Sequence, residues 1–171
     1  MSTKTLLAAL AAVMVAGPGG ARADTLQPEH HVNLNTAAAQ RASWLNTEAT
    51  LAMMGGKLDR AAELYSEAIG ANPDYPWPYY GRGEVLIEQG KIDQGVLALA
   101  QAERRFARDD LWGRSVALYA RGRALSMEGR CRAAKGAFDA YAALVTKKNP
   151  EAISEGHDVV ATCNAMHPHH G

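Results

Sequence analysis

Apolar residues recur along this chain at helical spacing, in blocks that glycine or proline separates. The clearest stripe consists of Ala61, Leu64, Tyr65 and Ala68, which occupy positions i, i+3, i+4 and i+7. Comparable blocks lie at 42–54, 76–89, 96–102, 116–128, 133–144 and 151–164. This is the period of an amphipathic α-helix, and no run of alternating apolar and polar residues indicates a strand. The pattern predicts an all-α fold.

Local signals mark where these helices begin and end. Glycine adopts the left-handed conformation that closes a helix, and proline stops one because it lacks an N–H donor. Short side chains with oxygen atoms cap the free N–H groups of a first turn. These signals place turns at Gly56, Gly90 and Gly129, stops at Pro73 and Pro150, and caps at Thr36, Asp59 and Asp93.

The helical unit repeats along the chain. Gly90 follows Gly56 by 34 residues and Gly129 follows Gly90 by 39, which indicates an insertion of about five residues within 103–114. With the turn glycine at position 15, position 8 holds the small residues Ala49, Gly83 and Gly122. A period of 34 with a small residue at this position resembles the tetratricopeptide repeat, a helix-turn-helix unit.

The resemblance implies an α-solenoid within residues 36–164. Three repeats are expected at about 42–75, 76–109 and 115–150, and a capping helix at 151–164 should cover the open end of the stack. In such a solenoid the first helix of each pair lines a concave groove. The resemblance therefore implies a binding scaffold for a peptide or protein.

Family positions on the groove hold aromatic, methionine and charged side chains, which are common at binding surfaces. For Met53, Trp77 and Tyr119, a half-buried core position is the alternative. The residues expected to contact a partner are Asn46, Thr50, Met53, Trp77, Tyr80, Glu84, Ile87, Tyr119, Arg123 and Met127.

The N-terminus has the features of a secretory signal peptide. Lys4 precedes an apolar run of eleven residues, and Ala21-Arg22-Ala23 forms a small-x-small cleavage site. The run is shorter than the roughly 20 residues that span a bilayer. We expect cleavage after Ala23, a flexible lead-in at 24–35, and a mature periplasmic or secreted chain without a transmembrane segment. The alternative, an N-terminal core helix, lacks an amphipathic pattern.

The two cysteines, Cys131 and Cys163, would meet an oxidising compartment after export. They begin the second helix of the last repeat and end the capping helix, so an antiparallel helix pair would bring them together. We expect a structural disulfide. A redox-active pair is the alternative, but the close Cys-x-x-Cys spacing is missing.

Charge is balanced overall but uneven along the chain. Residues 24–103 carry a net charge of −6 and residues 104–135 a net charge of +6. The balance excludes a general affinity for nucleic acid, and the basic third repeat favours a partner that is acidic at this point. An arginine-rich solvated face is the alternative interpretation.

Other chemistry has little support in the sequence. No nucleophile-base pair, phosphate loop or metal helix is present, so we expect no catalytic residue, no cofactor and no enzyme activity. His30 and His31 precede the helices, and His167, His169 and His170 lie in a His-rich tail at 165–171. These residues leave a periplasmic metal-handling protein as one alternative. A structural subunit of an envelope complex is another.

Overall fold

A computed structural model of the chain describes residues 36–145 and 150–167, with the side chains of 150–152 left out. The expected signal peptide (1–23), the lead-in (24–35), Asn149 and the end of the His-rich tail lie outside the described residues. Seven helices are present in the described part. They are α1 (Ala37–Met54), α2 (Leu58–Ala71), α3 (Pro76–Glu88), α4 (Ile92–Arg105), α5 (Leu111–Met127), α6 (Cys131–Val145) and α7 (Pro150–Met166).

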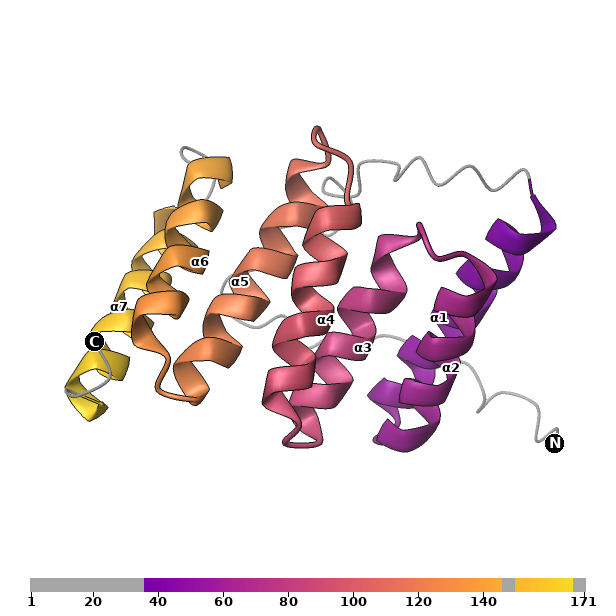
Figure 1. Ribbon diagram of the computed structural model, residues 1–171, viewed down its shortest axis with the longest axis horizontal. Coiled ribbons are helices and arrows are strands. Elements are labelled where there is room, and N and C mark those ends of the chain that lie inside the picture. Colours follow the sequence, from indigo (N-terminus) through magenta and orange to yellow (C-terminus); the bar gives the residue numbers. More distant parts are fainter. Residues whose placement is uncertain (1–35, 146–149, 168–171) are drawn as a thin grey trace, which may run out of the picture. The chain divides into compact units, whose positions relative to one another are not determined.

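The helices form consecutive pairs that lie side by side in chain order (Figure 1). α1 packs on α2, α3 on α4 and α5 on α6, while α7 packs on both α5 and α6. The first helices of neighbouring pairs also contact each other, α1 with α3, α3 with α5, and α5 with α7. The described part of the chain is therefore an all-α solenoid, as the sequence predicted.

Each helix pair is joined by the same three-residue turn. The turn glycines have positive φ angles of 71° at Gly56, 75° at Gly90 and 69° at Gly129. The Gly56 N–H donates to the Met53 carbonyl, and the next N–H donates to the Ala52 carbonyl, both at 2.9 Å. The turns at Gly90 and Gly129 repeat this pair of bonds, which is the Schellman motif. The predicted turns are confirmed.

The expected caps have a mixed outcome. Thr36 caps α1, because its Oγ1 accepts a hydrogen bond of 3.1 Å from the Ala39 N–H. The prediction for Asp59 and Asp93 was wrong: the N-cap residues are Lys57 and Lys91, without a side-chain cap. The turn is so short that the residue after the glycine already caps the next helix. The two aspartates fall inside the first turn of α2 and α4.

The displaced aspartates link neighbouring repeats. The Gln89 side-chain amide donates to Asp59 at 2.9 Å, and the Arg130 guanidinium donates to Asp93 at 3.0 Å. Each bond joins the second helix of one repeat to the turn region of the next. The inserted residues also have a clear position: α5 has 17 residues against 13 for α3, and the loop before it has five residues (106–110) against four (72–75).

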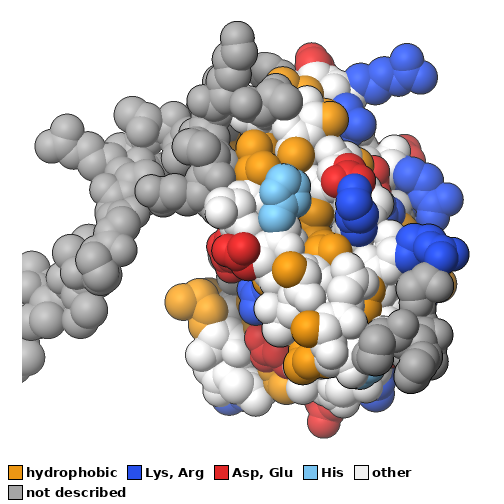
Figure 2. Space-filling model, turned by 90° about the vertical axis from the view of Figure 1, so that its left-hand side faces the viewer, with side chains coloured by type: hydrophobic (Ala, Val, Ile, Leu, Met, Phe, Trp, Pro, Cys, Tyr) orange, Lys and Arg blue, Asp and Glu red, His pale blue; other side chains and the backbone are white. Residues whose placement is uncertain are grey.

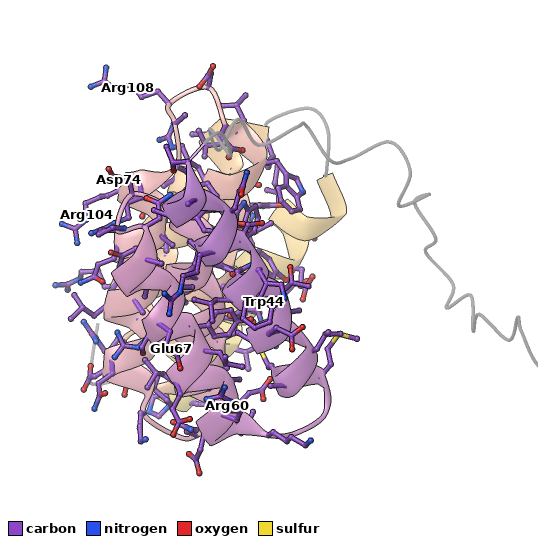
Figure 3. All side chains as sticks on the ribbon, turned by 90° about the vertical axis from the view of Figure 1, so that its right-hand side faces the viewer. Trp44, Arg60, Glu67, Asp74, Arg104 and Arg108 are labelled. Carbon is purple, nitrogen blue, oxygen red and sulfur yellow. A yellow bond between two sulfur atoms is a disulfide. The ribbon has the colours of Figure 1, made fainter. Side chains whose placement is uncertain are left out.

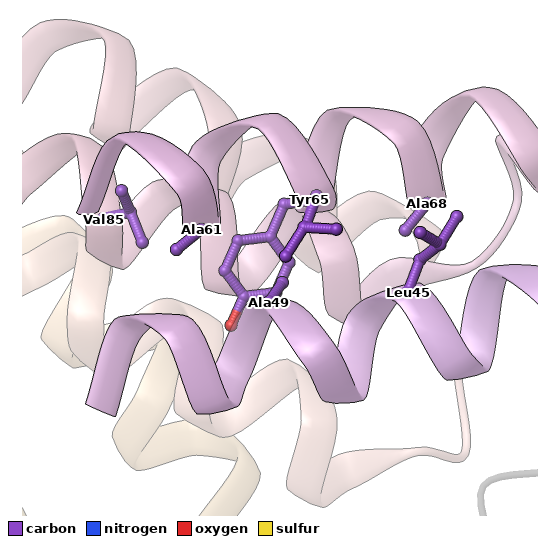
Figure 4. Packing of buried hydrophobic residues seen from close by; sticks show 7 residues of the cluster. Leu45, Ala49, Ala61, Tyr65, Ala68 and Val85 are labelled. Carbon is purple, nitrogen blue, oxygen red and sulfur yellow. The ribbon is translucent and has the colours of Figure 1, made fainter. Parts of the chain in front are cut away.

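Small residues allow the helices of a pair to approach closely. In the first pair, Leu45, Ala49, Ala61, Tyr65 and Ala68 are buried and pack together with Val85 (Figure 4). In the second pair the contact is glycine on glycine. A Cβ atom on Gly95 would lie 2.9 Å from the Gly83 carbonyl oxygen, and one on Gly83 would lie 2.8 Å from Leu99 Cγ. The two backbones are therefore in direct contact.

α7 is attached to the last pair by a disulfide and a narrow apolar stripe. Cys131 and Cys163 are bonded, with their Cα atoms 5.6 Å apart, so the expected disulfide is present. Gly156 packs directly on Phe138, and Val160 is buried beside it. The ring of His167 lies against Gly129. None of the helices in the described residues is long and apolar enough to cross a membrane.

The glycine contact between α3 and α4 can be tested by substitution. Gly83→Val should destabilise the protein by about 1–3 kcal/mol, because the added atoms must displace Leu99 or separate the two backbones. Gly70→Ala is the matched control: it also lies in a helix, but no atom would contact its Cβ. This change should stabilise by about 0.4–1 kcal/mol. Urea unfolding monitored by circular dichroism measures both; equal stability of the two variants would contradict the packing argument.

Candidate partner-binding face

The first helices place a set of polar and aromatic side chains on one side of the stack, which we call the first-helix face. It is formed by α1, α3, α5 and α7, whose contacts with one another make it continuous. The same repeat positions recur on it. Position 5 holds Asn46, Tyr80 and Tyr119, and position 9 holds Thr50, Glu84 and Arg123.

α7 continues this register, which the sequence analysis did not recognise because it treated α7 only as a cap. Gly81 of α3 packs on the Tyr65 ring, and Gly156 of α7 packs in the same way on Phe138, the residue equivalent to Tyr65. Position 5 of α7 is therefore Glu155. The signal that could have found it was the small residue Gly156 in the position of Gly81.

Tyr65 is a second residue of this face that the sequence analysis placed only in the core. It comes from α2 and is 2% exposed, yet its hydroxyl lies 3.1 Å from the Thr50 hydroxyl on α1. Gly81 leaves room for the ring, because a Cβ there would collide with it. Burial is the main reason that the pKa of Tyr65 is raised; the Glu84 carboxylate also raises it, and the Thr50 hydrogen bond acts in the opposite direction.

Glu84 lies at the centre of the first-helix face and is half-buried. Desolvation by burial is the main reason that the pKa of its carboxyl group is raised. Arg123 on α5 lowers it and Glu88 raises it further. Within the described residues, no side chain donates a hydrogen bond to Glu84 and no basic group forms an ion pair with it. The charged form of Glu84 therefore costs free energy in the folded protein.

Tyrosines surround the charged residues on both sides. Burial, followed by the charge of Glu84, raises the pKa of Tyr80 to about 12. Burial also raises the pKa of Tyr119 to about 12, and the hydrogen bond and charge of Glu155 add to this effect. Arg123 lowers the pKa of both hydroxyl groups. The charges along the face therefore alternate from Glu84 to Arg123 to Glu155.

The remaining predicted contact residues differ in how far they are exposed. Asn46, Met53 and Ile87 are half-buried, whereas Met127 is 62% exposed. Trp77 is half-buried in an aromatic cluster, with ring centroids 4.9 Å from Phe106, 5.0 Å from Trp112 and 5.8 Å from Tyr80. Phe106 and Trp112 come from the loop and the first turn of α5, where the inserted residues lie. Side chains next to the insertion therefore pack against the ring of Trp77 on the first-helix face.

The basic residues of the segment 104–135 are distributed around the solenoid. Arg121 pairs with Glu103 at 2.7 Å, and Lys135 pairs with Asp139 at 2.7 Å. The guanidinium of Arg105 lies over the Tyr79 ring at 3.9 Å and also donates to the Pro73 carbonyl. Figure 3 shows Arg104 and Arg108 projecting outward from the molecule.

At the C-terminal end of the stack, basic and acidic side chains are distributed differently. Basic side chains lie mostly along one edge there, and acidic ones are spread over the face (Figure 2). Arg123 is the basic residue of this segment whose charge acts on the tyrosines and Glu84 of the first-helix face. A strongly basic segment of sequence has not produced a strongly basic first-helix face.

Other kinds of site are less well supported. Among the described residues, no group of three His, Cys, Asp or Glu side chains could hold a metal ion. His30, His31, His169 and His170 lie outside the described residues, so the metal-handling alternative stays a prediction. A surface depression lies at the α5–α6 turn, lined by Glu128, Gly129, Arg130, Arg132 and Ala133. Its lining includes none of the residues named for the first-helix face.

Comparison with known proteins agrees with this architecture. Residues 52–121 match the model of the family described as Tetratricopeptide repeat. The Arabidopsis OM64 TPR domain has a TM-score of 0.64 at 17% identity, over 74% of this chain and 98% of that domain. The TPR2B domain of yeast Sti1, in a complex with pHsp70, has a TM-score of 0.65 at 15% identity, over 74% and 98%.

A third solved structure is the first TPR of Spaghetti (RPAP3) bound to the HSP90 peptide SRMEEVD. It has a TM-score of 0.63 at 20% identity, over 72% of this chain and 93% of that one. No curated protein matches the sequence. At these identities the likeness concerns the fold. The described part of the chain is thus an all-α solenoid with the fold of tetratricopeptide-repeat domains.

The cost of the charge on Glu84 can be measured through stability. A carboxyl group whose pKa is higher in the folded than in the unfolded state binds more protons when folded, so its contribution to stability falls as pH rises through this window. Glu84→Gln should therefore raise the melting temperature by a few degrees at pH 7. The gain should shrink at acidic pH, where the wild-type carboxyl is protonated.

Glu67→Gln on α2 is the control for this measurement, because Glu67 is exposed and lies on the other helix layer. It should leave the melting temperature nearly unchanged across the same pH range. Differential scanning calorimetry from pH 4 to 8 makes the comparison. A lower melting temperature of Glu84→Gln at pH 7 would show that the carboxylate stabilises the fold.

Proposed function

We propose that this protein is an exported scaffold that binds a peptide or a segment of a partner protein on its first-helix face. The observation that carries the proposal is the character of this face. It joins four helices and combines half-buried tyrosines with a carboxylate that lacks a direct partner within the described residues. If this surface served only to fold the chain, we would expect a hydrogen-bond donor or a basic group to contact the Glu84 carboxylate.

The dimensions of the face suit an extended peptide. Packed helices lie about 8–10 Å apart, so the row from α1 through α3 and α5 to α7 spans about 24–30 Å. An extended segment of about eight residues has this length, at about 3.3 Å per residue. The repeated positions 5 and 9 would then meet successive parts of one chain. Two of the structurally similar proteins are described as complexes, with pHsp70 and with an HSP90 peptide.

The partner's chemistry can be approached from the charges on the face. The sequence alone favoured a partner that is acidic toward the third repeat. Arg123 is the group that would meet such a carboxylate, and its exposed side chain is free to reach it. Glu84 and Glu155 on either side would favour basic or amide groups. An acidic partner segment therefore stays a prediction restricted to the neighbourhood of Arg123.

A capture experiment tests the role of the face. We expect that the double variant Tyr80→Ala/Arg123→Ala loses most of the proteins that the wild type captures from an envelope extract of the source cells. Truncating an aromatic or arginine contact at the centre of an interface typically costs 2 kcal/mol or more, about thirtyfold in affinity. Quantitative mass spectrometry of the captured proteins measures the loss.

The control changes the opposite layer. Arg60 and Glu67 form an ion pair at 3.7 Å on the exposed surface of α2, so Arg60→Gln/Glu67→Gln should retain the captured proteins. Far-UV circular dichroism should be the same for all three proteins. Equal capture by the wild type and the Tyr80/Arg123 variant would move the binding surface off the first-helix face.

Export and the disulfide make a joint prediction for the mature chain. We expect the protein purified from the periplasm or culture medium to begin at Asp24, because cleavage follows Ala23. Its intact mass should be two hydrogen atoms below that of the reduced chain, because Cys131 and Cys163 are bonded. Mass spectrometry before and after reduction measures both features. A chain that retains Met1 would contradict export by this signal.

A further inference from the structure

We infer that Glu84 is the receptor for a basic side chain, a lysine or an arginine, of the segment that binds to the first-helix face. The inference rests on the proposed function and specifies its chemistry. It starts from an imbalance on the face, where the half-buried Glu84 carboxylate is near tyrosines and a second carboxylate but has no direct donor among the described residues.

The chain itself contains a matched comparison. Glu103 on α4 is similarly placed at the edge of the core, with 21% of its side chain exposed. Arg121 on α5 satisfies it with an ion pair of 2.7 Å. Arg123 follows two residues later on the same helix, and its charge acts on Glu84. It is exposed, however, and forms no such pair within the described residues. In the part of the chain that the structure describes, an ion pair thus compensates the charge of Glu103, whereas Glu84 has no such pair.

The surroundings of Glu84 favour a cation over other ligands. Glu88 lies one helical turn further along α3 and adds negative charge. Tyr65 and Tyr80 lie close enough for the charge of Glu84 to act on their hydroxyl groups. Tyr65 is buried, so Tyr80 is the one of these two rings that a partner can reach. An electron-rich ring face next to a carboxylate suits an ammonium or guanidinium group. A metal ion would need more oxygen ligands than one half-buried carboxylate and its exposed neighbour supply.

The position of Arg123 makes the site directional. A partner that places its basic side chain on Glu84 brings the next part of its chain to Arg123, one helix further along the face. The exposed guanidinium can then contact a carboxylate or a backbone carbonyl of the partner. The partner segment therefore carries its positive charge over α3 and its oxygen-rich part over α5. This order differs from an acidic segment that covers the whole third repeat.

Selection from a peptide library tests the inference. A phage-displayed library of random 12-residue peptides is selected on the immobilised mature protein, and the selected sequences are aligned. We expect lysine or arginine to be enriched at one aligned position. A synthetic copy of the best peptide should bind Glu84→Gln about tenfold more weakly than the wild type, because one partner of a partly desolvated charge pair is removed. Glu67→Gln on the opposite layer should bind like the wild type.

A charge exchange distinguishes direct contact from an indirect effect. The peptide whose enriched lysine is replaced by glutamate should bind the wild type weakly and regain most of its affinity for Glu84→Lys. Such recovery in a double-mutant cycle requires that the two side chains interact. Isothermal titration calorimetry gives the four dissociation constants, and circular dichroism checks that the variants remain folded.

The possible results separate the inference from the proposed function. If peptides are selected and compete with one another, but show no enrichment of basic residues or bind Glu84→Gln unchanged, the assignment of Glu84 is wrong while peptide binding stands. If the library yields no peptide that depends on Tyr80 or Arg123, the proposed function fails together with the inference. Recovery in the charge exchange supports both.

Discussion

The close approach of the two helices in each repeat is the constraint on which the rest of this structure depends. It is set by a glycine with positive φ at each turn and by a small residue at position 8. Where both contact residues are glycines, as at Gly83 and Gly95, the backbones themselves touch. A Cβ on Gly83 would meet Leu99 and one on Gly122 would meet Phe138, so the small residue at position 8 makes room for a side chain of the partner helix. Tyr65 and Phe138 also reach the first helix that follows, where a Cβ on Gly81 or Gly156 would collide with their rings.

This packing of large side chains against glycine explains how a residue from a second helix reaches the first-helix face. The Tyr65 ring passes over Gly81 and brings its hydroxyl to Thr50. The same geometry recurs at Phe138 and Gly156, so α7 is held as if it began a further repeat. The disulfide at the other end of α7 supplements a stripe in which Gly156, Val160 and Cys163 are the buried residues. α7 thus covers the end of the solenoid and also forms the last helix of the first-helix face.

The sequence predicted the parts of the fold that depend on local rules. The glycine turns, the Thr36 cap, the helical stripes and the disulfide follow from residue type and spacing, and each is present. Asp59 and Asp93 show the limit of such rules, because a good capping residue two positions past the N-cap cannot act as a cap. The distribution of charge over the surface was harder to predict. The net charge of 104–135 describes a stretch of chain, whereas Arg121, Arg123 and Lys135 point to different neighbours.

The candidate site was only partly accessible from the sequence, for a physical reason. Repeat positions identify which residues share a face, and they led to Tyr80, Glu84, Tyr119 and Arg123. They do not tell which charges are compensated, since this depends on contacts between helices far apart in the chain. Glu84 on α3 and Glu103 on α4 both belong to the second repeat, and each has an arginine available on α5. Only Glu103 forms a direct ion pair with its arginine. Glu84 remains half-buried without one, and burial disfavours its charged form. Natural proteins keep such unfavourable groups chiefly where binding needs them, and this is why the centre of the face, rather than its more exposed residues, carries the functional argument.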